Sequence, residues 1–217
     1  MGLSKTIIST LSMFHLIFAT NNAHKVEEVR AVLGTAFTLE TMREAGIGID
    51  IPEPHDTLEA NALEKARTIW KLTGKDCFSE DTGLEVEALN GEPGVRSARY
   101  AGDDRSPRAN IDKLLARLGE AGGADGLADR AARFRTVIAL ILDGQEYLFE
   151  GICPGHILET VRGEGGFGYD PVFVPEGANR TFAEMPMEEK SRFSHRRKAM
   201  DQLTDFLKKQ PDGQNKN

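Results

Sequence analysis

The sequence FSEDTGLEVEALNGEPGVRSARYAG, residues 78–102, places two adjacent carboxylates between two β-prone runs. An apolar run ending at Phe78 leads into Glu80 and Asp81, and a Thr-Gly pair follows them. The segment LEVEAL then alternates apolar and acidic residues with the two-residue period of a strand. The pattern predicts a strand, a tight turn that holds both carboxylates, and a second strand.

These carboxylates have two interpretations. A carboxylate pair at the end of a strand suits a divalent metal and a phosphate ester, in a chain that also has glycine-rich and lysine-bearing turns. The alternative is an acidic hairpin on the surface. Residues 78–102 considered alone slightly favour this alternative. The choice depends on the segments before and after it.

The composition indicates a globular protein with a sizeable core. The chain has 217 residues, 40% of them hydrophobic, which suits one domain or two closely packed lobes. Its net charge of -7 and pI of about 5.3 are unlike those of a general nucleic-acid binder, so no nucleic acid polymer is expected as a partner. Cys77 and Cys153 lie far apart and outside any CxxC motif, which argues against a disulfide framework or a zinc site and fits a reducing cytoplasm.

The N-terminal segment is fairly apolar from residue 7 to residue 19. Polar residues interrupt this run, which is too short to span a bilayer and is at most a weak signal peptide. We expect residues 13–19 to be the first core strand and residues 1–12 to be a disordered lead or an upstream start, with Met1 or Met13 as the true start. No other segment approaches a transmembrane length, so no membrane partner is expected.

A strand, a short polar turn and a helix are predicted between residue 15 and Gly34. Asn22 is the expected N-cap, apolar residues recur at helical spacing after it, and Gly34 can close the helix. Lys25 falls in the first turn, where its charge opposes the helix dipole. An anion docked on the free N–H groups of that turn would reverse the penalty, whereas the alternative is a lysine that points into water.

The next segment holds one conformationally restricted acid. After a predicted strand at residues 38–42, Glu53 lies between two prolines, which confine its backbone to an extended conformation. A helix is predicted from about residue 58 to residue 72. On this helix Asn61 and Lys65 are expected to be exposed or to lie behind the site, and the pattern assigns them no chemistry.

The middle of the chain predicts a helix and a hairpin. Ser106 caps a helix with proline at its first position, an apolar stripe follows, and Gly119 is expected to stop the helix. Residues 132–142 become a continuous apolar run, which is typical of a central strand. Asp143-Gly144 is a strong two-residue turn signal, so residues 146–152 are expected to return as the partner strand.

The segment GEGGFGYDPVFVPEG, residues 163–177, surrounds Phe167 with glycines and leads into a short VFV strand. An aromatic ring between glycines can stack on a flat base because the backbone can approach closely, and Asp170 could accept hydrogen bonds from that base. A glycine-rich turn with core aromatic residues explains the segment equally well.

The last helix is predicted to begin near Ser194, and its first turn holds His195, Arg196, Arg197 and Lys198. These residues carry the wrong sign of charge for a helix N-terminus, so some of them require an electronegative partner. A solvated basic end is an equally good explanation for Arg197 and Lys198, and a weaker one for the two residues beside the cap.

Four separated motifs together resemble the inosine/xanthosine triphosphate pyrophosphatase family, the RdgB type of non-standard purine NTP pyrophosphatase. They are ATNNAHKVEEV, SEDTGLEVEALNGEPGVRSARYAG, GFGYDPVF, and TFAEM followed by EEKSRFSHRRKAM, and the resemblance covers residues 13–208. It implies one α/β domain over these residues, with a long mixed sheet, helices on both sides and two lobes around a central substrate cleft, followed by a disordered tail at 209–217. It also implies a homodimer.

The resemblance implies an activity as well. Family members use Mg²⁺ to hydrolyse ITP, dITP and XTP to the monophosphate and pyrophosphate, which cleanses the nucleotide pool. A related Maf-like pyrophosphatase would act on pyrimidine or modified nucleotides, and a non-catalytic nucleotide-binding protein would keep the same cleft. The FGYD segment together with His195 and Arg196 favours purines, and Glu53 with Asp81 favours an enzyme.

The family's site residues carry over by position. Asp81 is expected to ligate Mg²⁺ and accept a proton from the attacking water, with Glu53 as the second metal-associated acid and Glu80 as a weaker candidate for the same cluster. The family most often has glycine where Asn21 stands. The expected substrate-binding residues are Thr20, Asn21, Asn22, Ala23, His24 and Lys25 in the phosphate-binding turn, Thr82 beside the catalytic acid, and Phe167, Gly168, Tyr169, Asp170, Lys190, His195 and Arg196 around the base.

Lys190 and Arg196 also suggest how the base is chosen, because their side chains can only donate hydrogen bonds. If they point at position 6 of the purine, they complement the keto group of hypoxanthine or xanthine and oppose the amino group of adenine. A site built on such bonds rejects the wrong partner by on the order of 10⁴-fold.

Overall fold

The computed structural model describes residues 14–33, 37–122 and 129–210. The predicted N-terminal lead at 1–12 and the part of the predicted tail at 211–217 lie outside these residues, as does Gly34, the expected end of the first helix. Within the described ranges, we find no helix with both the length and the apolar character that crossing a bilayer demands.

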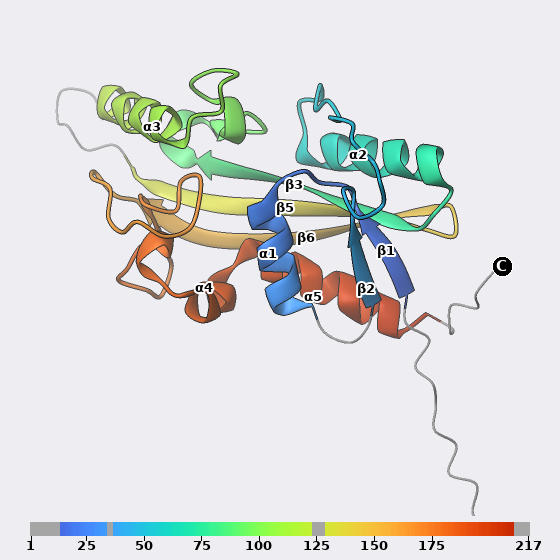
Figure 1. Cartoon of the computed structure of the whole chain (residues 1–217). Coiled ribbons are helices and arrows are strands. Elements are labelled where there is room, and N and C mark those ends of the chain that lie inside the picture. Colours follow the sequence, from blue (N-terminus) through green and yellow to red (C-terminus); the bar gives the residue numbers. More distant parts are fainter. Residues whose placement is uncertain (1–13, 34–36, 123–128, 211–217) are drawn as a thin grey trace, which may run out of the picture.

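A mixed β-sheet forms the centre of the molecule (Figure 1). Its strand order is β2-β1-β3-β5-β6-β7, and a short strand, β4, pairs with β3 outside this order. The first three strands in this order are parallel, and the pairs from β3 onward are antiparallel. The strands are β1 (Phe14–Phe18), β2 (Phe37–Thr41), β3 (Cys77–Val86), β4 (Pro93–Gly94), β5 (Ala131–Leu142), β6 (Gln145–Ile157) and β7 (Phe173–Pro175).

Helices cover both faces of this sheet, which confirms the predicted α/β fold. α2 lies on one face of the sheet, and α1 and α5 lie on the other (Figure 1). α3 packs on Leu84 and Phe134, whose side chains point to the same face of the sheet as those beneath α5. The short helix α4 was not predicted from the sequence. The helices are α1 (Ala23–Val32), α2 (Leu58–Thr73), α3 (Pro107–Ala121), α4 (Met187–Phe193) and α5 (His195–Lys208).

The strand that carries Glu80 and Asp81 is continuous, so the predicted turn after these residues is wrong. β3 pairs with β5 without a break along its whole length. Gly83 is needed for close packing and not for a turn, because a Cβ atom at this position would lie 2.7 Å from the carbonyl oxygen of Gly94 in β4. The glycine therefore permits the close approach of the neighbouring strand, and both carboxylates lie in the middle of the sheet.

Neighbouring residues on a strand point to opposite faces, and this separates the two carboxylates. Phe78 packs in the core cluster beside α1 and α5, and Glu80 follows it on the same face. Cys77 packs in the cluster beside α2, and Asp81 follows on that face. The two acids are therefore adjacent in sequence but meet different helices.

The hairpin predicted at Asp143-Gly144 is confirmed. Both residues have positive φ, 50° and 76°, as a tight two-residue turn requires. Most of β5 is buried, because α2 packs against one of its faces and α5 against the other. This double coverage explains why the strand reads as a continuous apolar run.

Three helix starts predicted from the sequence are confirmed. The side chains of Asn22, Ser106 and Ser194 each accept a hydrogen bond from a backbone amide in the first turn of α1, α3 and α5. Gly119, however, does not stop α3, which continues to Ala121. The glycine is exposed, and helix propagation from the preceding turns outweighs its unfavourable propensity.

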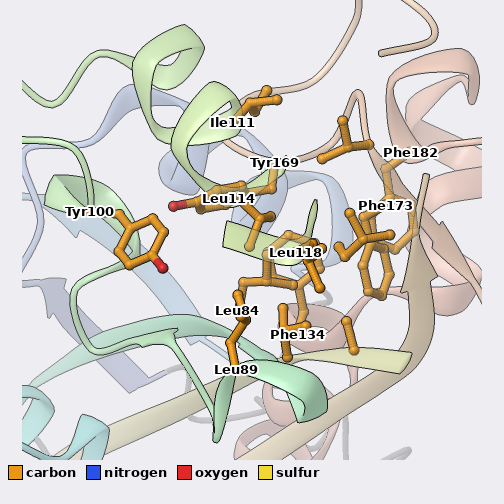
Figure 2. Packing of buried hydrophobic residues seen from close by; sticks show 14 of the residues in the cluster. Leu84, Leu89, Tyr100, Ile111, Leu114, Leu118, Phe134, Tyr169, Phe173 and Phe182 are labelled. Carbon is orange, nitrogen blue, oxygen red and sulfur yellow. The ribbon is translucent and has the colours of Figure 1, made fainter. Parts of the chain in front are cut away.

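The end of the sheet beneath α3 has its own core of aliphatic and aromatic side chains (Figure 2). Leu114 of α3 packs there with Phe134 and Phe173. Tyr169 belongs to the same cluster, and its hydroxyl donates a hydrogen bond to the carbonyl oxygen of Ser97 at 2.9 Å. This packing anchors the glycine-rich segment that carries the predicted base-binding residues.

Two glycine substitutions should change stability in opposite directions. A Cβ at Gly151 in β6 would overlap the carbonyl oxygen of His195, so we expect Gly151→Ala to displace α5 and lower the free energy of unfolding by about 3 kcal/mol. The space around Gly119 is open, so Gly119→Ala should raise this free energy by about 0.5–1 kcal/mol. Equilibrium urea unfolding measures both changes. A Gly151→Ala variant as stable as the parent would contradict the close packing of α5 on β6.

Candidate active site

A cavity of about 490 Å³ brings together residues from all four sequence motifs. Two of the expected residues do not line the cavity in the described structure: Ala23, the first residue of α1, and Glu80, the weaker candidate for the acid cluster. The expected site residues that do line it are Thr20, Asn21, Asn22, His24, Lys25, Glu53, Asp81, Thr82, Phe167, Gly168, Tyr169, Asp170, Lys190, His195 and Arg196.

The turn before α1 is closed by its own hydrogen bonds. The Thr20 hydroxyl oxygen accepts from the backbone amide of Asn22 at 3.1 Å. Asn22 Oδ1 in turn accepts from the amides of His24 and Lys25 at 3.0 and 3.3 Å. Two of the amides that were expected to be free for an anion are therefore already engaged by the cap.

Asn21 occupies its place in this turn without strain. It is not among the residues with positive φ, so the glycine that is frequent here in the resembled family is not needed for the backbone conformation. Its side-chain amide donates to the carbonyl oxygen of Ile49 at 3.0 Å. Asn21 thus ties the turn to the loop that leads to Glu53.

Glu80 is fully buried, and both of its oxygens are bound by cations. Arg196 of α5 donates from Nε to Oε2 at 2.7 Å and from Nη2 to Oε1 at 2.9 Å, and Lys25 Nζ lies 3.2 Å from Oε1. Burial acts to raise the pKa of Glu80, but the two cations outweigh it and lower that pKa to about 2. Glu80 therefore anchors Lys25 and Arg196, which corrects its expected place in the metal-binding acid cluster.

Lys190 and Arg196 are joined by Glu28 of α1, a buried residue that the sequence analysis missed. Glu28 Oε1 accepts from Lys190 Nζ at 2.6 Å, and Oε2 accepts from Arg196 Nη1. Lys190 Nζ also donates to Asp170 Oδ2 at 2.6 Å. The local sequence pattern holds no signal for Glu28, because its burial depends on α4 and α5, which come from the far end of the chain.

The basic residues at the start of α5 divide into two groups. Arg196 is buried and paired with carboxylates, as its position beside the cap suggested. Arg197 pairs with Asp201 along the exposed side of the helix, and Lys198 donates to the carbonyl oxygen of Ile152. Arg197 and Lys198 therefore lie at the surface, as the alternative of a solvated basic helix end predicted.

His195 is buried and uncharged. Burial, together with the nearby positive charges of Arg196 and Lys190, lowers the pKa of His195 well below its usual value. Its ring stacks on Phe134 with centroids 4.7 Å apart, and its Nδ1 has no hydrogen-bond partner among the described residues. A neutral imidazole nitrogen in the wall of the cavity can donate or accept a hydrogen bond.

Asp81 and Glu53 are connected by a lysine to which the sequence analysis assigned no chemistry. Lys65 Nζ lies 3.3 Å from Asp81 Oδ1 and also donates to Glu53 Oε1. Lys65 is buried behind the carboxylates and lines the cavity.

Asn61, one turn earlier on α2, is buried as well. Its Oδ1 accepts a hydrogen bond from the backbone amide of His55 at 2.9 Å, and its Nδ2 donates to the carbonyl oxygen of His55 at 3.1 Å. These bonds fix the loop that carries Glu53.

Glu53 is held on both sides by cations. Arg99 Nη2 donates to the Glu53 carbonyl oxygen at 2.8 Å, and its Nη1 lies 3.5 Å from Oε2. Burial acts to raise the pKa of Glu53, but Lys65 outweighs it, with help from Lys25 and Arg99, and lowers the pKa. Glu53 is therefore an ionised acid facing the cavity.

Asp81 keeps one oxygen without a partner. Its Oδ2 is buried and accepts no hydrogen bond in the part of the chain that the structure describes. Burial, with added repulsion from Glu53, raises the pKa of Asp81 against the opposing charges of Lys65 and Lys25. An unpartnered carboxylate oxygen in this position suits a metal cation or a proton.

The acids fit a metal that takes few protein ligands. Within the described residues, no three His, Cys, Asp or Glu side chains gather into a metal-binding group. Asp81 and Glu53 supply two carboxylates, and Asp81 Oδ2 is available. Mg²⁺ is commonly bound by one or two carboxylates together with substrate phosphates and water, so this donor set matches it.

Phe167 lies half-buried at the other end of the cavity. The His24 ring is stacked on it, with centroids 5.3 Å apart and planes 8° from parallel, and Lys190 Nζ lies 5.0 Å from the Phe167 centroid. Asp170 Oδ2 accepts from the Phe167 amide at 2.8 Å, and a Cβ at Gly166 would overlap that carboxylate. The segment is thus a tight glycine turn, and it also forms a wall of the cavity. Both interpretations offered by the sequence, a glycine-rich turn and a base-binding segment, are compatible with this position.

Comparison with known proteins identifies the family. The model of the Ham1 family matches residues 16–206. A dITP/XTP pyrophosphatase from Porphyromonas gingivalis is 51% identical over 90% of this chain and 98% of its own, and one from Flavobacterium johnsoniae is 47% identical over 88% and 97%. The structure of a HAM1 protein from Coxiella burnetii superimposes with a TM-score of 0.82, at 36% identity over 91% of this chain and all of that one. The chain described here belongs to the Ham1 family.

Proposed function

We propose that this chain is a pyrophosphatase that hydrolyses dITP, ITP and XTP to the monophosphate and pyrophosphate. The observation that carries the proposal is the unpartnered carboxylate oxygen of Asp81, in the wall of a cavity that also holds Lys25 and the Phe167 ring. The cavity thus offers a proton acceptor, a cation for phosphate and a flat apolar surface for a base. The two curated relatives are named dITP/XTP pyrophosphatases, which supports dITP and XTP as substrates.

Asp81 and Glu53 are the residues that would hold Mg²⁺. When bound, the metal would polarise the phosphate oxygens and lower the pKa of a coordinated water. Lys65 holds Asp81 through Oδ1, which leaves Oδ2 for the cation or for the water proton. Arg99 and Lys65 together keep Glu53 ionised and directed at the same place.

The residues of the chain can carry the proton and charge movements of this hydrolysis. The oxygen of the attacking water forms the new bond to phosphorus, and its proton passes to Asp81, whose Oδ2 accepts no hydrogen bond from the described residues. The α–β anhydride bond breaks, and its electron pair leaves with pyrophosphate. Lys25 lies where it can stabilise the negative charge of that leaving group.

The donors at the base end can select a 6-keto purine. Lys190 Nζ has three N–H groups, and Glu28 and Asp170 accept from it. Arg196 Nη1 has two N–H groups, and Glu28 accepts from it. Each cation therefore retains donor capacity toward the cavity, while the carboxylates hold it in place. A keto oxygen can use these donors, whereas the amino group of adenine places a donor against a donor.

Two alternatives considered from the sequence are less well supported. The curated relatives are named for purine substrates, which disfavours a Maf-like enzyme for pyrimidine nucleotides. A non-catalytic binding protein has no need of a buried, unpartnered carboxylate oxygen beside a second acid. We further propose that the enzyme acts as a homodimer on the cytoplasmic nucleotide pool.

The products of ITP hydrolysis test the proposed reaction. Incubation with ITP and Mg²⁺ should yield IMP and pyrophosphate in equal amounts, as measured by chromatography of the nucleotides and a coupled pyrophosphate assay. Removal of Mg²⁺ with EDTA should abolish turnover, and ATP should be a much poorer substrate. Formation of IDP and orthophosphate would contradict cleavage at the α–β bond.

Substitution of Asp81 tests its role as the base. Asp81→Asn removes the proton acceptor but keeps the shape of the side chain, so kcat for ITP should fall by about 10²–10⁴-fold. Glu85→Gln is a matched control on the same strand, because Glu85 pairs with Arg133 and does not line the cavity. It should retain near-parental kcat. Thermal unfolding of both variants shows whether the fold is kept, and a folded Asp81→Asn enzyme with normal kcat would exclude this residue as the base.

A further inference from the structure

His24 has an unexpected position for a residue of the phosphate-binding turn. It is the second residue of α1, directly before Lys25, whose amine points to Glu80. The His24 ring instead lies on Phe167, in the glycine-rich segment of the base end. Both rings line the same cavity. The side chain of His24 thus reaches from the phosphate turn to the place where a base is expected.

The two rings form a parallel aromatic stack that would have to open to admit a base. Their planes are 8° from parallel, and the 5.3 Å between centroids is a normal distance for offset stacking. A purine between them requires about 7 Å, twice the optimal carbon–carbon contact of about 3.5 Å. The His24 ring must therefore move outward to admit a flat base, because the centroids of the two rings are now closer together than this distance.

Little holds the His24 ring in its present position. Its side chain is 60% exposed, and the one acid near it within the described residues is Glu27, whose Oε2 lies 3.8 Å from Nδ1. Lys190 and Arg196, which also lie near the Phe167 ring, are buried. His24 therefore marks the solvent side of the base end, and the cations mark its inner side.

We propose that His24 is a base-contacting residue, which stacks on the outer face of the substrate purine while Phe167 stacks on the other. This assignment rests on the proposed function and adds to it. A base that turns its 6-keto edge to Lys190 and Arg196 and lies on Phe167 exposes its remaining face to solvent. The exposed, flat imidazole of His24 covers that face, and a two-ring purine provides more surface for it than a pyrimidine.

Three variants separate stacking from other roles. His24→Ala removes the ring, and His24→Phe retains a flat ring without the imidazole nitrogens. His156→Ala is a control, because His156 is an exposed residue of β6 that does not line the cavity. Stacking of a base on an aromatic side chain is worth enough that His24→Ala should raise KM for ITP about tenfold, equivalent to about 1.4 kcal/mol. We expect kcat to stay within about twofold of the parent, and His24→Phe to recover most of the loss, since either flat ring can stack.

Calorimetric titration identifies which part of the nucleotide His24 contacts. His24→Ala should weaken binding of IMP about tenfold and leave binding of ribose 5-phosphate unchanged, since the second ligand lacks the base. Equal weakening of both ligands would place His24 at the phosphate and overturn the proposal. A lower KM or tighter IMP binding in His24→Ala would also overturn it, because the ring would then be an obstacle.

The same titration distinguishes failure of this inference from failure of the proposed function. A parent protein that binds IMP but releases no pyrophosphate from ITP would contradict the pyrophosphatase activity, and the effect of His24→Ala on IMP binding would still be measurable. A parent protein that binds no IMP would overturn the proposed stacking of the base directly. Far-UV circular dichroism confirms that each variant keeps its helices.

Discussion

The structure depends on the alternation of side chains along β3, which sends two adjacent carboxylates to opposite faces of a buried sheet. A carboxylate in such a place is costly unless cations reach it. Glu80 meets Arg196 and Lys25 on one face, and Asp81 meets Lys65 on the other. The helices that cover the sheet must therefore supply charges at fixed positions as well as apolar surface.

The two carboxylates are neutralised to different degrees, and this difference gives them different roles. Glu80 has both oxygens bonded and a lowered pKa, so it serves as the fixed anion that positions Arg196 and Lys25. Asp81 has one oxygen free and a raised pKa. Glu28 extends the anchoring to Lys190, so that every cation of the base end is held by at least one buried carboxylate. Such held charges need little reorganisation when substrate arrives.

Much of this arrangement could be predicted from the sequence because it depends on local patterns. Cap residues, the Asp143-Gly144 turn and the period of the apolar residues predicted most element starts and the buried central strand. Nearly all of the site residues predicted from the four motifs line the cavity, although the cavity also has lining residues that were not predicted, such as Lys65. The predicted turn after Asp81 was wrong because Gly83 reads as a turn residue locally, whereas its true constraint is the carbonyl oxygen of Gly94 on another strand.

The sequence alone thus determined the fold class, the family resemblance and many of the residues that line the cavity, since these depend on residue types and on their spacing along the chain. The tertiary structure decided which charges are anchors and which are available. The roles of Lys65, Glu28 and His24 depend on partners far away in sequence, and no local pattern shows whether such a side chain faces water, an opposite charge or another ring. In the stretch at 78–102, the sequence placed two carboxylates side by side, and only the sheet separated Asp81 from Glu80.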